Sequence, residues 1–351
     1  MRRLLVPILA TLLATAALCC APEQVPPQQG TPSHPGGGGG GGGGSGVGGS
    51  GGEVTAPVPL VAPVALTVQP GSGRTFLTGA LGSATRSIRV VSYLLTDDPI
   101  ENALIAAAGR GVDVRVIVEG SQPSNTAARD HLTAGGVQVR EGDPAYALTH
   151  EKALVVDDAL AFVLSQNLTN AGFDSNREYD LTFSGPEVAE LAAIFDADWS
   201  RAGFTTETSL VLSPTNSRQR LESLFSSARD EILVTMEVFN DTHSRDVLVA
   251  RARAGIRVRV VLADPSSVAD NRETANILTA AGAEVRWLGS PVIHAKAIVM
   301  DRRLAYVGSV NLTFSSLDRN REVGLVTDDA AAVARIIQTI EGDLSAGQAG
   351  F

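Results

Sequence analysis

The sequence contains very little lysine and very little cysteine, and both scarcities restrict what the protein can do. Of its 28 Lys and Arg residues only Lys152 and Lys296 are lysines, and its two cysteines are Cys19 and Cys20. The chain beyond residue 20 therefore has no thiol for a disulfide bond or for thiol catalysis. Because lysine offers a compact, rotatable ammonium group that arginine does not, the two positions that keep lysine are candidate functional positions.

The chain also lacks an excess of basic charge. Its formal net charge is −10 at pH 7. Such a chain has no general electrostatic attraction to nucleic acid or to anionic lipid head groups, although a local cationic pocket can still form. Its length of 351 residues is sufficient for two average domains or for one large duplicated domain with an ample core.

The first 20 residues have the pattern of a signal peptide. Arg2 and Arg3 precede an apolar stretch, Leu4–Leu18, that is short for a transmembrane span. The segment ends in Cys19 and Cys20 and resembles a bacterial lipoprotein signal, in which cleavage leaves a lipid-modified cysteine at the start of the chain. The alternative is an ordinary signal peptide. We therefore expect an exported protein of the bacterial cell envelope, periplasmic or on the outer surface, that is lipid-anchored at one of these cysteines or otherwise secreted.

Residues 21–57 have the composition of a disordered tether. They are rich in Pro, Gln, Gly and Ser and include an unbroken glycine run from residue 36 to residue 44. Such a segment cannot bury enough apolar surface to offset the entropy of ordering it. We expect it to connect an anchored end to a folded part.

The rest of the chain is an internal repeat with an offset of 144 residues. The aligned positions include Leu66 with Leu210, Ile88 with Ile232, and residues 111–116 with residues 255–260. In each copy, strand-like segments alternate with helical ones, which predicts an α/β fold. We expect repeats at 58–204 and 205–351, forming two homologous α-β-α layered halves that pack as an intramolecular pseudo-dimer with the active site at their interface.

Each repeat carries the same set of polar residues at the same spacing. The two sets are His150, Lys152, Asp157, Ser165 and Asn167, and His294, Lys296, Asp301, Ser309 and Asn311. A glutamate follows each histidine after 28 residues, at Glu178 and Glu322. A histidine and a lysine two positions apart in a strand share one face. Two such strands facing each other would bring two imidazoles, two ammonium groups and two amides into one pocket.

These groups match the requirements of phosphodiester cleavage. A catalyst must neutralise the phosphate charge, supply a nucleophile and protonate the leaving alkoxide. The two motif lysines supply cations, and the asparagines, together with the motif serines, supply donors for the non-bridging oxygens. One imidazole can attack phosphorus while the other delivers a proton. Glu178 and Glu322 are candidates to accept a hydrogen bond from the far ring nitrogen and so select the tautomer.

The doubled pattern resembles the paired HKD motifs of the phospholipase D superfamily. Asn176-Arg177-Glu178 and Asn320-Arg321-Glu322 resemble the downstream Asn-x-Glu element of that family, and the resemblance covers about residues 64–345. One position departs from it, because the first copy has Leu164 where the second copy and the family have glycine, here Gly308.

The resemblance implies a mechanism and a set of roles. It implies double displacement through a covalent phosphohistidine, with no cofactor and no metal, and a monomer that acts at a membrane surface. His150 would be the nucleophile and His294 the acid, although the residues alone leave the two equivalent. Asp157 and Asp301 would be structural. A zinc site is disfavoured because no close ligand pair occurs and two lysines would oppose a cation.

Three functions are consistent with the sequence. The first is a phospholipase D-type phosphodiesterase that hydrolyses phospholipids to phosphatidate and a head-group alcohol. The second is a metal-independent endonuclease that applies the same two-histidine chemistry to DNA or RNA, for which Arg251, Arg253, Arg257 and Arg259 leave room. The third is a catalytically silent binding module, which two complete motifs disfavour.

Overall fold

The computed structural model describes residues 58–350. The expected signal peptide (1–20), the expected tether (21–57) and the two cysteines considered for lipid attachment lie outside the described residues. Within residues 58–350, no helix combines the length and apolar character needed to cross a membrane.

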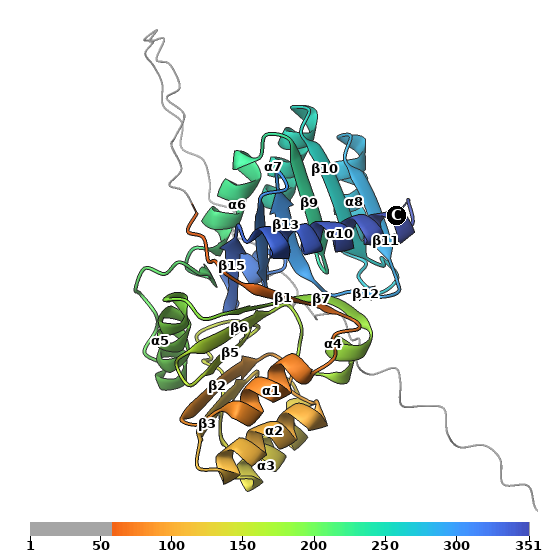
Figure 1. Cartoon of the computed structure of the whole chain (residues 1–351). Helices are drawn as coiled ribbons and strands as arrows, with labels where there is room; N and C mark the ends of the chain where they lie inside the picture. Colours follow the sequence, from red (N-terminus) through yellow and green to blue (C-terminus); the bar gives the residue numbers. More distant parts are fainter. Residues whose placement is uncertain (1–57, 351) are drawn as a thin grey trace, which may run out of the picture. The chain divides into compact units, whose positions relative to one another are not determined.

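The first half of the described chain forms one mixed sheet with helices on both faces (Figure 1). Its elements are β1 (Ala65–Gln69), α1 (Thr75–Ser83), β2 (Ser87–Ser92), α2 (Asp98–Gly109), β3 (Asp113–Val118), α3 (Asn125–Ala134), β4 (Gln138–Glu141), β5 (Lys152–Val156), β6 (Leu160–Leu164), α4 (Asn170–Asp174), β7 (Asn176–Phe183) and α5 (Glu187–Ser200). The strand order is β1-β7-β6-β5-β2-β3-β4. β2, β3 and β4 are parallel, and the remaining pairs are antiparallel.

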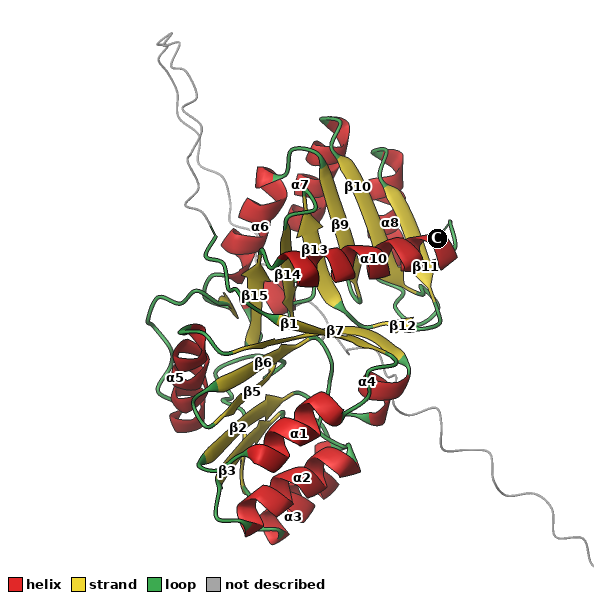
Figure 2. Cartoon of the chain, in the orientation of Figure 1, coloured by secondary structure: helices red, strands yellow, loops and turns green. Residues whose placement is uncertain are grey.

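The second half repeats this strand order and has one additional strand, β12, which pairs with β7 of the first half. Its elements are β8 (Val211–Ser213), α6 (Ser217–Ser227), β9 (Glu231–Met236), α7 (Thr242–Arg253), β10 (Arg257–Ala263), α8 (Asn271–Ala280), β11 (Glu284–Leu288), β12 (Val292–Ile293), β13 (Lys296–Met300), β14 (Leu304–Gly308), α9 (Phe314–Asp318), β15 (Glu322–Thr327) and α10 (Ala330–Ala346). The order β8-β15-β14-β13-β9-β10-β11 matches that of the first sheet. In Figure 2, α10 crosses one face of this sheet and α7 and α8 lie behind it. The predicted α/β fold of two α-β-α halves is confirmed.

The motif strands β5 and β13 lie in the middle of their sheets, and every residue in them is buried. Their apolar side chains alternate between two cores, as side chains on a strand must. In β5, Leu154 and Val156 pack with α1, α2 and α3, whereas Ala153 and Val155 belong to the cluster that contains α5 and the inner-face residues of the other half. Because both faces of each sheet are covered at these strands, the residues that follow each lysine are all apolar.

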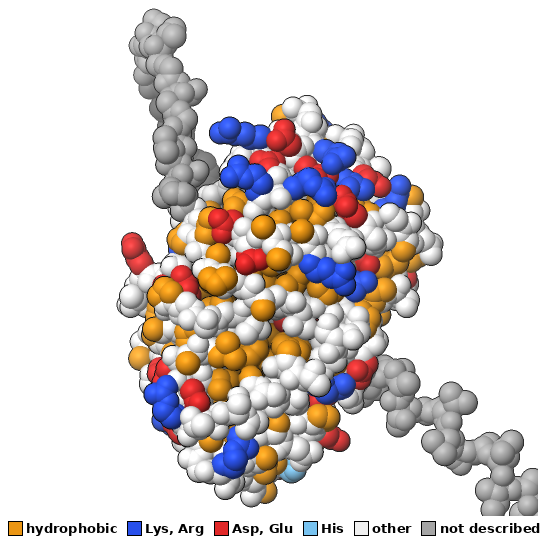
Figure 3. Space-filling view, viewed as in Figure 1, with side chains coloured by type: hydrophobic (Ala, Val, Ile, Leu, Met, Phe, Trp, Pro, Cys, Tyr) orange, Lys and Arg blue, Asp and Glu red, His pale blue; other side chains and the backbone are white. Residues whose placement is uncertain are grey.

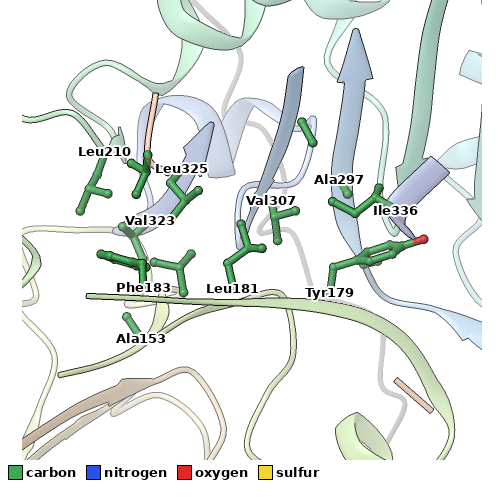
Figure 4. Close-up of a cluster of buried hydrophobic side chains, with 14 of the residues drawn as sticks. Ala153, Tyr179, Leu181, Phe183, Leu210, Ala297, Val307, Val323, Leu325 and Ile336 are labelled. Carbon is green, nitrogen blue, oxygen red and sulfur yellow. The ribbon is translucent and has the colours of Figure 1, made fainter. Parts of the chain in front are cut away.

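The inner faces of the two sheets share one hydrophobic core. Figure 4 shows Leu181 and Phe183 of β7 beside Val307 of β14 and Val323 and Leu325 of β15. Helices α5 and α10 contribute to the same cluster of buried side chains. Burying a leucine or phenylalanine side chain contributes roughly 1.5–3 kcal/mol, so this core joins the halves into one unit.

Several short elements were absent from the sequence-based expectation. The edge strands β1 and β8 and the two-residue β12 were not predicted, and neither were the short helices α4 and α9 that follow the motif asparagines. Thr169 and Thr313 cap these helices by accepting hydrogen bonds from Gly172 N and Ser316 N. Segments of two to five residues are too short to show a helical or strand period, so the pattern could not reveal them.

The mismatch between Leu164 and Gly308 has a packing cause. A Cβ atom at Gly308 would lie 2.4 Å from Gly324 Cα and 2.6 Å from the Tyr306 hydroxyl oxygen, so no side chain fits there. The counterpart of Tyr306 in the first half is Phe162, which has no hydroxyl group. Leu164 is fully buried at the matching position. The substitution therefore changes packing without removing a reactive group.

Candidate active site

The segment before each motif histidine pairs with the opposite half of the chain. The backbone N–H of His150 donates to the carbonyl oxygen of Arg321 at 2.9 Å, just before β15. On the other side, β12 runs parallel to the start of β7, and the N–H of His294 donates to the carbonyl oxygen of Arg177 at 3.4 Å. Each histidine is thereby placed next to the Asn-Arg-Glu element of the other repeat.

The histidine–glutamate contacts are consequently crossed. His150 Nδ1 lies 2.9 Å from both carboxylate oxygens of Glu322, and His294 Nδ1 lies 2.6 Å from Glu178 Oε1. Both glutamate side chains are completely buried. Burial acts to raise the pKa of Glu322, but the nearby His150 and Lys152 lower it below its ordinary value. Because each Nδ1 is occupied by a carboxylate, Nε2 is the nitrogen that remains for chemistry on each ring.

The two lysines are completely buried beside these histidines. Lys152 Nζ donates to the His150 carbonyl oxygen at 2.6 Å and lies 3.0 Å from His150 Nε2. Lys296 Nζ donates to the His294 carbonyl oxygen at 2.6 Å and to Glu237 Oε2 at 2.6 Å. A buried cation requires such partners, and these contacts hold each ammonium group beside its motif histidine.

The motif asparagines lie in the loops that follow β6 and β14. Asn311 Oδ1 accepts from the N–H of Val238 at 3.1 Å, and its Nδ2 donates to Glu237 Oε2 at 3.3 Å. Asn167 is 9% exposed at the matching position. The Asn311 amide thus shares Glu237 Oε2 with Lys296, the first residue of β13.

The motif serines have partners other than the expected phosphate oxygens. Ser165 Oγ donates to Glu178 Oε2 at 2.6 Å and accepts from the N–H of Tyr179 at 2.9 Å. Ser309 Oγ bonds to the backbone N–H and carbonyl of Val323, at 3.1 and 3.2 Å. Both serines are completely buried. Their hydroxyl groups therefore position the glutamate-bearing strands β7 and β15, and donation from these serines to phosphate oxygens stays a prediction.

The motif aspartates close the turns behind the site. Asp157 and Asp158 have φ of 55° and 51° in the three-residue loop that joins β5 to β6. The Asp157 carboxylate accepts from the backbone N–H groups of Thr85, Arg86 and Ser87, and Asp301 accepts in the same way from Arg229, Asp230 and Glu231. Both tie the motif hairpin to the start of the neighbouring strand.

We expect Asp157→Asn to destabilise the protein in a pH-dependent manner. Burial acts to raise the pKa of Asp157, but the backbone donors lower it from 3.8 to about 2. A depressed folded-state pKa contributes stability that is present above the unfolded pKa near 4 and is lost as the pH falls through about 2. Urea unfolding should therefore show a gap between wild type and variant at pH 7 that narrows between pH 4 and pH 2. Asp158→Asn, at a half-exposed carboxylate paired with Arg89, serves as the control. A gap that is constant with pH would contradict the prediction.

Two residues that the sequence reading missed lie at equivalent repeat positions in the site. Glu237, after β9, has Oε2 at 2.6 Å from Lys296 Nζ and at 3.6 Å from His294 Nε2. Tyr93, after β2, packs edge-on against the His150 ring with centroids 4.7 Å apart. Burial acts to raise the pKa of Glu237, but His294 and Lys296 lower it far below its ordinary value. The 144-residue offset could have revealed them, because it aligns Tyr93 with Glu237 directly after equivalent strands, where the two copies differ in chemical character.

Comparisons with known proteins show which proteins this chain is similar to. The family model described as "Cardiolipin synthase, PLD-like domain" matches residues 77–199 and 221–344. Cardiolipin synthase B of Salmonella typhimurium (strain LT2) is 25% identical over 313 residues, which cover 75% of this chain and 76% of that protein. Cardiolipin synthase B of Escherichia coli (strain K12) is 24% identical over 300 residues, covering 71% of this chain and 72% of that protein.

Two solved structures share the fold. Phosphatidylserine synthase of Haemophilus influenzae Rd KW20 superposes with a TM-score of 0.59 at 13% identity, covering 80% of this chain and 86% of that one. Polyphosphate kinase of Porphyromonas gingivalis gives a TM-score of 0.65 at 17% identity, and the match covers 84% of this chain and 51%, about half, of that chain. At these identities the similarity concerns the fold alone.

Proposed function

The chain belongs to the phospholipase D superfamily, and from this membership we propose that it cleaves a phosphodiester bond of a phospholipid through a phosphohistidine intermediate. The observation that carries the proposal is the crossed pair of histidine–glutamate contacts. Each carboxylate holds one Nδ1, so both reactive Nε2 atoms belong to one site that also contains two buried lysines. The cardiolipin synthase relatives support a lipid as substrate.

In the first step, His150 Nε2 forms a bond to phosphorus. The bond between phosphorus and the head-group oxygen breaks, and its electron pair stays on that oxygen. Protonated His294 donates a proton to the same oxygen, so a neutral alcohol leaves. The ammonium groups of Lys152 and Lys296 and the motif amides stabilise the negative charge on the non-bridging oxygens.

In the second step, an acceptor hydroxyl attacks phosphorus while His294 takes its proton. The bond between phosphorus and His150 Nε2 breaks, and its electron pair returns to the imidazole. With water as acceptor the product is phosphatidate, as expected for a hydrolase. With a hydroxyl of a second phosphatidylglycerol the product is cardiolipin, the reaction suggested by the names of the relatives. The chemistry at His150 and His294 is the same for both acceptors.

The surface charge favours a lipid over nucleic acid. Binding to a nucleic-acid backbone depends on cations that neutralise successive phosphates. Several arginines of the second half are instead paired with carboxylates: Arg257 with Glu231 at 2.6 Å, Arg259 with Glu284 at 2.8 Å, and Arg302 with Glu341 at 2.7 Å. On the face shown in Figure 3, basic and acidic side chains are interspersed.

A substrate panel tests the proposal. The protein should be offered vesicles of phosphatidylglycerol, phosphatidylcholine or cardiolipin, and supercoiled plasmid DNA, all with a chelator present. We expect release of the head-group alcohol together with phosphatidate or a new phospholipid, and intact plasmid. A variant with both His150→Ala and His294→Ala is the control and should release nothing. Plasmid nicking without lipid turnover would favour the endonuclease, and no turnover of any substrate would favour a binding module.

We further propose that the protein works as an exported monomer at a membrane surface. The expected signal peptide and the expected tether support this placement, and the active site is completed by two halves of one chain. Fractionation of cells that express the full chain, before and after Cys19→Ser and Cys20→Ser, tests whether a lipid anchor holds it.

A further inference from the structure

The two active-site histidines have different electrostatic surroundings at the nitrogen that reacts. His150 Nε2 lies 3.0 Å from the Lys152 ammonium nitrogen. His294 Nε2 lies 3.6 Å from a carboxylate oxygen of Glu237. One reactive nitrogen therefore faces a cation and the other faces an anion, although the motifs that carry them are the same.

The repeat carries different residues at one pair of equivalent positions beside the two rings, outside the motifs. Tyr93 follows β2 and Glu237 follows β9 in matching places of the repeat. The Tyr93 ring packs edge-on against His150 with an interplanar angle of 61°, and the Lys152 ammonium lies 5.3 Å from the centre of that ring. At the second position, the Glu237 carboxylate binds the Lys296 ammonium and approaches His294.

The hydrogen-bonding capacity of these two groups determines whether each Nε2 carries a lone pair or a proton. An ammonium group only donates, so a ring nitrogen 3.0 Å from Lys152 must present a lone pair. That is the form of His150 that can attack phosphorus. A carboxylate only accepts, so a ring nitrogen facing Glu237 is matched when it carries a proton.

His294 has a carboxylate at each ring nitrogen. Glu178 Oε1 lies 2.6 Å from Nδ1 and Glu237 Oε2 lies 3.6 Å from Nε2, an arrangement that suits the imidazolium ion with both nitrogens protonated. Lys296 Nζ also lies 3.4 Å from Nδ1, but its shorter contacts of 2.6 Å go to Glu237 and to the His294 carbonyl oxygen. The same carboxylate thus neutralises Lys296 and faces the proton that His294 must transfer.

We propose that Glu237 is a positioning residue that keeps His294 as the proton donor and thereby makes His150 the nucleophile. The inference rests on the proposed function, because it concerns the direction of the same two-step transfer. Glu237 does not react. It holds the proton on His294 Nε2 until that proton passes to the leaving oxygen, and it stabilises His294 again when the acceptor hydroxyl returns a proton.

A comparison of leaving groups tests this role. Phosphatidylglycerol needs a proton donor because it releases an alkoxide, whereas phosphatidyl-p-nitrophenol releases a stable phenolate and does not. Both lipids should be assayed in the same mixed micelles with the full chain. General acid catalysis contributes about 10²–10⁴-fold. We expect Glu237→Gln to lower kcat/KM for phosphatidylglycerol by about 30- to 100-fold, and for the nitrophenyl lipid by no more than about threefold, since Lys152, His150 and Glu322 are unchanged.

Three further variants complete the design. In His294→Ala the selective loss should appear in the first step alone: a burst of p-nitrophenol from the nitrophenyl lipid and no head-group release from phosphatidylglycerol, with no continued turnover of either lipid. Glu273→Gln removes a carboxylate whose side chain is 76% exposed and should leave both activities unchanged. Thermal unfolding checks each variant, and if Glu237→Gln does not fold, Glu237→Asp carries the same test with its loss again confined to phosphatidylglycerol.

The outcomes separate the two proposals. Equal losses on both lipids would show that Glu237 serves phosphate binding or folding, and would overturn the inference, as would unchanged activity on both. Wild-type protein that turns over neither lipid would instead overturn the proposed function, and this inference with it. Selective loss on phosphatidylglycerol would establish the role of Glu237.

Discussion

His150→Ala is expected to abolish turnover with either leaving group. Without the imidazole no bond to phosphorus can form, and removal of a nucleophile that acts within a catalytic unit costs on the order of 10⁶-fold in kcat. We expect no covalent adduct on this variant when it is incubated with phosphatidyl-p-nitrophenol. Intact-protein mass spectrometry after rapid acid-free quenching measures the adduct directly.

His294→Ala is expected to fail at a different step. It retains the nucleophile, so it should release p-nitrophenol from the nitrophenyl lipid in a burst and accumulate a phosphatidyl group on His150. The second step lacks the base that accepts the proton of the incoming hydroxyl, so turnover should then stop. Peptide mapping locates the adduct. An adduct on His294 in the His150→Ala protein would reverse the assignment, and substantial phospholipid turnover by either variant would eliminate the two-histidine scheme.

Arg321→Ala is expected to destabilise the protein by about 3–5 kcal/mol, the cost of leaving a buried charge without its partner. Arg321 is 1% exposed, and its Nε donates to Asp198 Oδ2 at 2.8 Å. Its guanidinium carbon lies 5.1 Å from the centre of the Tyr146 ring. Burial raises the pKa of Asp198 and raises that of the adjacent Glu151 well above its ordinary value, and Arg321 acts against the rise at both groups. Urea unfolding at pH 7 measures the change.

The repeat offers a matched control for this variant. Arg177 occupies the equivalent position, but it pairs with Asp343 through Nε and Nη2 at 2.7 and 2.8 Å and keeps 15% of its side chain exposed. Arg177→Ala should cost less, about 2 kcal/mol, because the Arg177 side chain is already partly exposed to water and its removal sacrifices fewer buried contacts. Equal costs at the two positions would contradict the assignment of Arg321 as a buried charge partner. Since the Arg321 carbonyl accepts from His150 N, we also expect Arg321→Ala to reduce turnover.

The sequence alone was sufficient for the fold class and for the chemical groups of the site. The 144-residue offset showed a duplication, and the alternation of strand-like and helical segments predicted two layered halves, now confirmed. Scarcity of lysine singled out Lys152 and Lys296, and both lie beside the motif histidines. These features can be recognised in the sequence because side chains alternate along a strand and because a duplicated unit repeats its own spacing.

Only the tertiary structure decided how these groups are connected. The spacing placed one glutamate 28 residues after each histidine, whereas the structure pairs His150 with Glu322, 172 residues away in the other half. It also directed the Ser165 hydroxyl to Glu178 and brought Glu237 and Tyr93, which belong to no motif, against the two imidazoles. Contacts across the packed inner faces of two sheets depend on how those sheets are arranged in space, which spacing along the chain does not encode. The packing of the halves therefore determines which carboxylate faces each histidine. It also gives two motifs of identical spacing different electrostatic surroundings.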